Sequence, residues 1–213
     1  MDKEMLLENL KKEWLHCKKC PLHKCNTPSD DNPSGRAFGR GNVDAPLLLV
    51  GEALGKTESS SGQVFDENAP AGGKLKQILS YYELQDLVYI ANPVACRSTK
   101  NGKNIKPDAS HYAACRPRFD RLVQIIQPEL IVAMGAGAAE VLTGQPIQIM
   151  KQMGEIFDTA YGLVIVVPHP CAYIYRQKDE DLRKKSDKIW RKIAKMAQSG
   201  LYSNREDQTK GAI

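Results

Sequence analysis

The chain has 213 residues, of which 26% are charged and 42% hydrophobic, and its net charge is +5. A chain of this length buries enough surface for a stable single domain, so its six cysteines are not expected to form a disulfide scaffold. No apolar run reaches the length of a membrane span, and the charged N-terminus does not resemble a signal peptide. We therefore expect an intracellular, cytoplasmic protein in a reducing compartment. Its modest positive charge permits a polyanionic partner without requiring one.

The first part of the chain combines a helix, a cysteine pair and a loop. Residues 3–15 have the periodicity of an amphipathic helix, with Trp14 on its apolar stripe. Cys17 and Cys20 follow as a CxxC pair. Residues 26–45 are rich in Pro, Gly, Asp and Asn, which predicts a loop.

From residue 47 onward, short apolar runs alternate with helical segments. The apolar runs predict buried strands at 47–51, 87–92, 130–135 and 163–170. The remaining segments predict helices at 71–82, 109–126, 136–142 and 179–198. This alternation predicts an α/β fold, a three-layer αβα sandwich with a central, mostly parallel four-stranded sheet. We expect one domain over residues 1–198 and a polar C-terminal tail over 199–213.

Polar residues follow three of the predicted strands. Glu52 comes after the first strand, Asn92 ends the second, and His169 follows the fourth. Open parallel sheets bind ligands outside the carboxyl ends of their strands, so these three side chains are expected to share one site.

The CxxC pair and two distant cysteines, Cys96 and Cys115, suit a four-sulfur cage that ties the N-terminal segment to the middle of the fold. Such cages hold zinc or an iron–sulfur cluster, and the residues alone leave both open. The other two cysteines, Cys25 and Cys171, are not assigned to the cage. The CxxC spacing favours Cys17 and Cys20 over Cys25 as ligands.

Six motifs then occur in a fixed order along the chain. They are GEALGKTESSSGQVF (51–65), AGGKLKQIL (71–79), YIANPVACR (89–97), AACRP (113–117), IVAMGAGAAEVL (131–142) and HPCAYIYR (169–176). Together they resemble the family 4 uracil-DNA glycosylases, the iron–sulfur branch of the uracil-DNA glycosylase superfamily. The resemblance covers roughly residues 14–195. It implies the uracil-DNA glycosylase fold and a monomeric DNA repair enzyme.

The implied reaction is removal of uracil from single- or double-stranded DNA by base flipping, which leaves an abasic site. In this interpretation Glu52 holds the attacking water and stabilises the cation-like sugar, and His169 donates to the uracil O2. Phe65 stacks on the flipped base, and the Asn92 amide reads its edge. Each residue also has an ordinary structural alternative: a helix-end carboxylate for Glu52, a structural imidazole for His169, core packing for Phe65 and a turn cap for Asn92.

The resemblance adds further residues around the base. Ala53 and Glu58 belong to the first motif and are expected to line the base pocket, although Glu58 also suits a solvated loop. Tyr173 is a candidate wedge for the space that the base leaves, with helix packing as its alternative. Arg176 is a candidate phosphate contact. The loop 97–114 offers further basic contacts to the DNA backbone at Arg97, Lys100, Lys103 and Lys106.

The resemblance also implies a [4Fe–4S] cluster on Cys17, Cys20, Cys96 and Cys115, away from the base pocket and serving as a brace. Zinc remains the alternative metal, since both groups accept four thiolates.

The chain departs from the family pattern beside the expected pocket. Leu54 and Val64 replace prolines, residues 66–70 form a longer link, and Cys171 replaces a serine. These changes leave two alternatives open: a glycosylase with a different base specificity, and a DNA-binding replication-accessory protein without catalysis.

Overall fold

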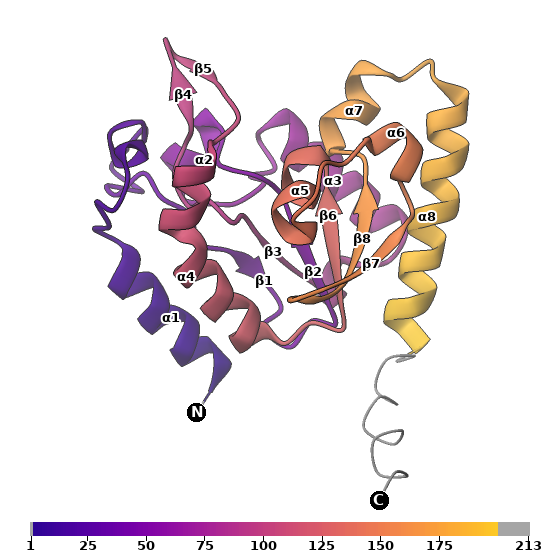
Figure 1. Cartoon of the computed structure of the whole chain (residues 1–213), viewed down its shortest axis with the longest axis horizontal. Helices are drawn as coiled ribbons and strands as arrows, with labels where there is room; N and C mark the ends of the chain where they lie inside the picture. Colours follow the sequence, from indigo (N-terminus) through magenta and orange to yellow (C-terminus); the bar gives the residue numbers. More distant parts are fainter. Residues whose placement is uncertain (1, 200–213) are drawn as a thin grey trace, which may run out of the picture.

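In the computed structural model, which describes residues 2–199, a six-stranded sheet lies between two layers of helices (Figure 1). The strands of this sheet are β1 (Arg40–Gly41), β2 (Leu47–Val50), β3 (Val88–Ala91), β6 (Leu130–Met134), β7 (Ile156–Thr159) and β8 (Gly162–Val167). Their order across the sheet is β1-β3-β2-β6-β8-β7. The four central strands are parallel, whereas β1 and β7 run antiparallel at the two edges.

The α/β sandwich predicted from the sequence is confirmed, but the predicted number of four strands is wrong. The four predicted strands form the buried parallel centre, and the two edge strands were missed. β1 is only two residues long and lies inside the segment 26–45 predicted as a loop. β7 alternates between exposed and half-exposed residues, so it lacks the apolar run that marks a buried strand. A separate hairpin, β4 (Thr99–Lys100) and β5 (Lys103–Asn104), was also missed.

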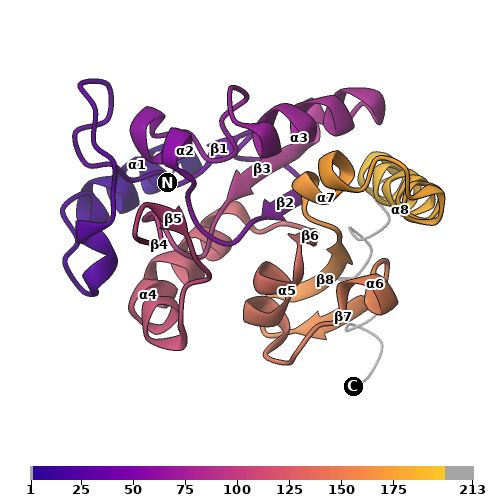
Figure 2. The same cartoon turned by 90° about the horizontal axis from the view of Figure 1, so that it is seen from above.

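The longer helices cover the two faces of the sheet, which Figure 2 shows from above. One face carries α3 (Pro70–Tyr81) and α8 (Glu180–Ser199). The other face carries α1 (Lys3–Trp14), α4 (Ala109–Ile126) and α5 (Ala136–Thr143). Short helices complete the described chain: α2 (Lys56–Ser61), α6 (Ile149–Gln152), α7 (Pro170–Tyr175) and the 3-10 turns Pro21–Lys24 and Gln85–Leu87.

The sheet separates two hydrophobic cores because successive side chains of a strand point to opposite faces. In β2, Leu47 and Leu49 pack with α3 and α8, and Leu48 and Val50 pack with α1, α4 and α5. All four are at most 1% exposed. Burial of each such side chain contributes about 1.5–3 kcal/mol, so the central strands are a main source of stability.

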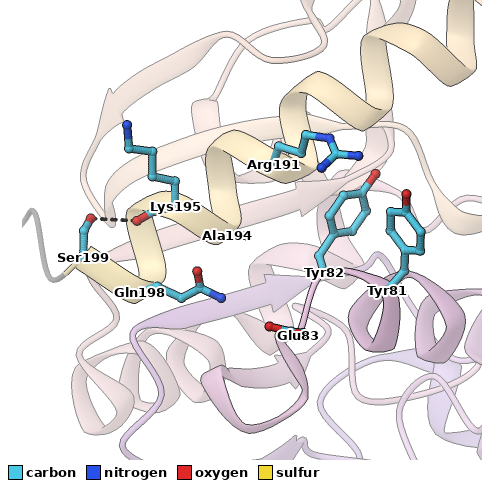
Figure 3. A pocket seen from close by; sticks show the side chains of 8 residues that line it. All are labelled: Tyr81, Tyr82, Glu83, Arg191, Ala194, Lys195, Gln198 and Ser199. Carbon is cyan, nitrogen blue, oxygen red and sulfur yellow. Dashed lines mark hydrogen bonds between the residues drawn. The ribbon is translucent and has the colours of Figure 1, made fainter.

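A shallow hollow marks the joint between α3 and α8 (Figure 3). Beside it, Tyr82 donates its hydroxyl hydrogen to Asp187 over 2.9 Å, and Arg191 donates to the other oxygen of Asp187 over 2.8 Å. The Tyr82 ring also stacks on Trp190. Tyr82 follows the last residue of α3, and the chain from there leads to the start of β3. The hollow therefore lies near the amino ends of the parallel strands, away from their carboxyl ends. It contains none of the predicted site residues.

The structure describes the predicted N-terminal helix and the cysteine segment as well as the sheet. The predicted tail lies outside the described residues from position 200 on, and Ser199 is the last residue of α8. No helix within residues 2–199 is long and apolar enough to cross a membrane.

Candidate active site and cysteine cage

A pocket of about 560 Å³ opens at the carboxyl ends of β2, β6 and β8, the edge that carries α5 and α7 at the top of Figure 1. A volume of this order is typical of small-ligand sites. Among the residues predicted from the sequence, the pocket wall contains Glu52, Ala53, Glu58, Phe65 and His169. The topology therefore brings together residues that are up to 117 positions apart in the chain.

Glu52 is held by a tyrosine of α4, Tyr112, which lies outside the pocket wall. The Tyr112 hydroxyl donates to its Oε1 over 2.8 Å, and this contact, together with burial, raises the pKa of Tyr112. The carboxylate lies against Gly137 at the start of α5, where a Cβ atom would come within 2.0 Å of Oε1. The Glu52 carboxylate therefore lies close to the first turn of α5.

Phe65 lines the pocket in a strained conformation that Glu58 maintains. Its φ of 51° lies in the left-handed region, which is unusual for a bulky residue. One oxygen of Glu58 accepts from the Phe65 amide and the other from the Gly55 amide, each over 2.5 Å. Arg40 donates to the Phe65 carbonyl over 2.9 Å. Both oxygens of Glu58 are therefore engaged in fixing the loop, and burial raises the pKa of this carboxyl.

His169 caps the short helix α7 and keeps one ring nitrogen free. Its Nδ1 accepts from the Cys171 amide over 3.2 Å, which leaves the hydrogen of the neutral ring on Nε2. Burial lowers the pKa of His169 below its ordinary value, so the ring is neutral at neutral pH. The ring centroid lies 5.8 Å from that of Phe65. His169 thus offers a neutral N–H donor beside an aromatic wall.

Asn92 lies behind the pocket wall rather than in it. The residue is 2% exposed, and neither its amide oxygen nor its amide nitrogen has a hydrogen-bonding partner among the described residues. The Asn92 oxygen and the edge of the Phe65 ring both lie against Gly51, where a Cβ atom would meet them at 2.5 and 2.6 Å. A buried amide without partners is costly, and such groups usually have a functional reason.

The four cysteines predicted as metal ligands line one small cavity on the α4 side of the pocket. Cys17 and Cys20 come from the segment after α1, Cys96 from the loop after β3, and Cys115 from α4. Ala53 packs against this group and also lines the pocket, so one residue separates the two sites. Cys25 does not line the cavity, and its thiol instead donates to the Thr99 carbonyl over 3.7 Å.

The cavity around these cysteines is also lined by two buried arginines, Arg36 and Arg118. Burial raises the pKa of the Cys96 thiol to about 11, an effect that Arg36 partly opposes. Burial likewise raises the pKa of Cys20. A group that binds thiolates here must therefore compensate the burial of negative charge, and the two guanidinium groups provide part of that compensation.

Comparison with known proteins identifies the family. The model of the Uracil DNA glycosylase superfamily matches residues 38–194, a range that contains the whole pocket, Cys96 and Cys115. The chain belongs to the uracil DNA glycosylase superfamily. It is 31% identical to the type-4 uracil-DNA glycosylase of Sulfurisphaera tokodaii, with 90% of this chain and 84% of that protein covered. It is 30% identical to the type-4 uracil-DNA glycosylase of Thermotoga maritima, with 85% and 90% covered.

Tyr173, the predicted wedge, is packed against the protein core in this structure. Its side chain packs into the core beneath α7, and its hydroxyl accepts from the Trp190 indole over 3.3 Å. The packing alternative applies to Tyr173. Tyr175, at the end of the same helix, is 80% exposed and lines the pocket. Tyr175 was not among the predicted site residues, although the AYIY stretch contains both tyrosines.

The basic residues predicted for the DNA backbone also divide into two groups. Arg97 is buried and donates to Asn104, Thr27 and the Gly102 carbonyl, so it holds the β4–β5 hairpin and is not free to meet a phosphate. The exposed cations are Lys100, Lys103, Lys106 and Arg176, of which Lys106 pairs with Glu140 and Arg176 with Asp179. Ile105, 46% exposed on the pocket rim, was not predicted.

Proposed function

We propose that the protein is a uracil-DNA glycosylase, an enzyme that hydrolyses the bond between uracil and deoxyribose in DNA and leaves an abasic site. The observation that carries the proposal is the neutral imidazole of His169, with its free Nε2 directed by the Cys171 contact, in one pocket with an aromatic ring and a fixed carboxylate. The names of the relatives support the same activity.

Base binding in this proposal uses Phe65 and Asn92. A flipped pyrimidine stacks on the Phe65 ring, which lines the pocket. The Asn92 amide lies behind this wall without a partner, so the wall at Gly51 and Phe65 must move aside for the amide to gain a donor and an acceptor from the edge of the base. Glu58 acts indirectly, because its carboxylate holds Phe65 in the strained conformation that presents the ring. Ala53 leaves room beside the base, since its side chain is a single methyl group in the pocket wall.

In the hydrolysis, the bond between C1′ of the sugar and N1 of the base breaks, and its electron pair leaves with the base. His169 Nε2–H donates to the uracil O2, where the negative charge accumulates. A water molecule held by Glu52 adds to C1′, and its proton passes to the carboxylate. The Glu52 charge also stabilises the cation-like sugar before the water adds. Tyr112 keeps the carboxylate oriented for both roles.

The DNA lies across the pocket mouth in this proposal. Tyr175 takes the role expected for Tyr173 and fills the space that the flipped base leaves. Ile105 meets the opposite side of the mouth, and the exposed cations Lys100, Lys103 and Arg176 approach the backbone phosphates. We further propose that the enzyme acts as a monomer on both single- and double-stranded DNA.

The cysteine cage suits a [4Fe–4S] cluster, which would be held by Cys17, Cys20, Cys96 and Cys115. The four thiols line one cavity with two buried cations, as a thiolate-bound group requires. Within residues 2–199, no three His, Cys, Asp or Glu side chains come close enough to hold a single ion. Zinc, which also accepts four thiolates, is the alternative occupant. When bound, the cluster would cross-link three segments of the chain.

Release of free base tests the proposed activity. The purified protein is incubated with single- and double-stranded oligonucleotides that contain one uracil, and the released base and the abasic product are both measured. Release of uracil supports the proposal. Binding without release would support the DNA-binding alternative and contradict the enzyme. Release of hypoxanthine, xanthine or a modified uracil in place of uracil would support the altered specificity, for which the departures that line the pocket are Leu54, Ala69, Pro70 and Cys171.

A further inference from the structure

We propose that Arg118 is a positioning residue that couples the cysteine cage to the base-reading segment around Asn92. In this inference the negative charge of the thiolate-bound group holds the Arg118 guanidinium in place, and the guanidinium in turn holds the backbone that presents the Asn92 amide. The inference rests on the proposed function, because it assigns Arg118 a role in reading the base.

Arg118 is a fully buried cation without an acidic partner. Its exposure is 0%, and none of the salt bridges within residues 2–199 includes it. A buried arginine without a counter-charge is strongly unfavourable, so the fold must supply negative charge nearby.

The cysteine cage supplies that charge. Arg118 lies three residues after Cys115 on α4, a spacing that puts both side chains on one helix face. It lines the same cavity as the four cysteines. Its Nε and Nη1 have no hydrogen-bonding partner among the described residues. Two unsatisfied donors on a buried cation beside four thiols indicate that thiolates, with the group they bind, are its missing partner.

The third nitrogen of the guanidinium reaches the base-reading segment. Nη2 donates to the Asn92 carbonyl over 2.5 Å and to the Pro93 carbonyl over 2.9 Å. These two carbonyls fix the chain where it leaves β3, and this is the backbone that carries the buried, unpartnered Asn92 amide. Loss of charge in the cage would therefore release the backbone on which base reading depends.

A purely structural role for Arg118 makes a different prediction. If the residue only anchors α4 to the end of β3, its two carbonyl contacts are sufficient and the state of the cage does not matter. If it couples the two sites, changes at Arg118 alter both the retention of iron and the binding of the base. The inference is decided by measuring both properties in the same variants.

The test uses the full-length protein and three variants: Arg118→Met, Arg118→Lys and the control Arg121→Met, which removes an exposed arginine one turn further along α4. The first readout is the loss of protein-bound iron during challenge with a chelator. Removal of a partner of this kind typically costs 10–100-fold in metal affinity, so we expect Arg118→Met to lose iron at least about tenfold faster than the wild type. The cluster of Arg118→Met should also have a more negative reduction potential than that of the wild type, because the variant lacks the positive charge that stabilises the reduced cluster.

The second readout is the binding of free uracil, which is measured as the rise in the melting temperature of the protein when uracil is added. We expect weaker binding in both Arg118 variants and unchanged binding in Arg121→Met. Arg118→Lys keeps the charge but cannot span both carbonyls as the guanidinium does, so it should retain iron better than Arg118→Met while still binding uracil poorly.

Some outcomes would overturn the inference. The inference is overturned if Arg118→Met and Arg121→Met lose iron at the same rate and have the same reduction potential. It is also overturned if the wild-type protein binds no iron. If Arg118→Met does not fold, Arg118→Lys decides the question, because unchanged uracil binding in that variant contradicts the coupling. A wild-type protein that retains iron but releases no uracil contradicts the proposed function instead, and the iron readouts still test the cage half of the inference.

Discussion

At the residue scale, the pocket uses neighbouring groups to orient its two chemical side chains. The Tyr112 hydroxyl binds one oxygen of Glu52 and leaves the other oxygen available. The Cys171 amide binds one nitrogen of His169 and leaves the other nitrogen as a donor. Orientation before the reaction avoids the cost of reorganising these groups during it. The role of each residue can therefore be tested by changes that keep the supporting contact.

For Glu52, the informative change is Glu52→Gln. The amide keeps an oxygen for the Tyr112 hydroxyl but loses the charge and the ability to accept a proton. We expect the rate constant for uracil release under single-turnover conditions to fall by about 10²–10⁴-fold, with little change in the melting temperature. The matched control is Glu8→Gln on the exposed surface of α1. Wild-type rates in Glu52→Gln would remove Glu52 from the mechanism.

His169 predicts a specific dependence of stability on pH. Burial lowers its pKa in the folded protein below the ordinary value of 6.5, so the unfolded chain binds more protons below that pH. Since protonation favours the state that binds more protons, the contribution of neutral His169 is complete above about pH 6.5 and is lost as the pH falls through the folded pKa.

Urea unfolding at pH 7.5 and pH 5.5 measures this effect in the wild type and in His169→Gln. The wild type should lose more free energy of unfolding between the two pH values than the variant does. Uracil release should also persist at pH 6, where an unperturbed histidine would be largely protonated. An equal loss of stability in both proteins would contradict a neutral buried ring.

At the element scale, the short helix α7 places its two tyrosines in different surroundings. Proline at its first position and the His169 cap start the helix at a fixed point. The helix then turns Tyr173 toward Trp190 in the core and leaves Tyr175 exposed at the pocket. Two residues that are two positions apart lie on different faces of a helix, so only one of them can be the wedge.

The two tyrosines should respond in opposite ways to replacement by alanine. Tyr173→Ala removes a packed aromatic side chain and should lower the free energy of unfolding by about 3 kcal/mol. Tyr175→Ala should leave stability unchanged but slow uracil release from double-stranded DNA more than from single-stranded DNA, where no stacked partner strand must be displaced. Denaturant unfolding and single-turnover release on both substrates measure the two effects. Equal rates on both substrates in Tyr175→Ala would argue against a wedge.

At the scale of the whole molecule, the cysteine cage joins three segments that are distant in the chain. It connects the segment after α1, the loop after β3 and the first half of α4. The same loop after β3 continues into the β4–β5 hairpin, which Arg97 fastens and which carries Ile105 to the pocket rim. A group bound in the cage would therefore stabilise both the N-terminal segment and one side of the pocket mouth.

Loss of the bound group should thus affect the entire protein. We expect Cys96→Ser to lower the iron content, the visible absorbance and the melting temperature together, because the serine oxygen is a poor substitute for a thiolate ligand. Cys25→Ser is the matched control, since Cys25 lies beside the cage without lining its cavity. Full iron content in Cys96→Ser, or an equal loss in Cys25→Ser, would contradict the assigned ligands. That residues 1–198 form one domain stays a prediction that this experiment does not address.

Local patterns in the chain predicted the parallel centre of the sheet, the strand-end position of Glu52 and His169, and the four cysteines that line one cavity, because apolar runs, strand ends and cysteine spacing can be recognised without the fold. They did not determine the edge strands β1 and β7, the clamp that Glu58 forms on Phe65, the burial of Arg97 or the choice of Tyr175 over Tyr173. Each of these depends on which segment, distant in the chain, packs against the residue. A local pattern places a residue on an element, but only the tertiary structure decides which of its faces is covered.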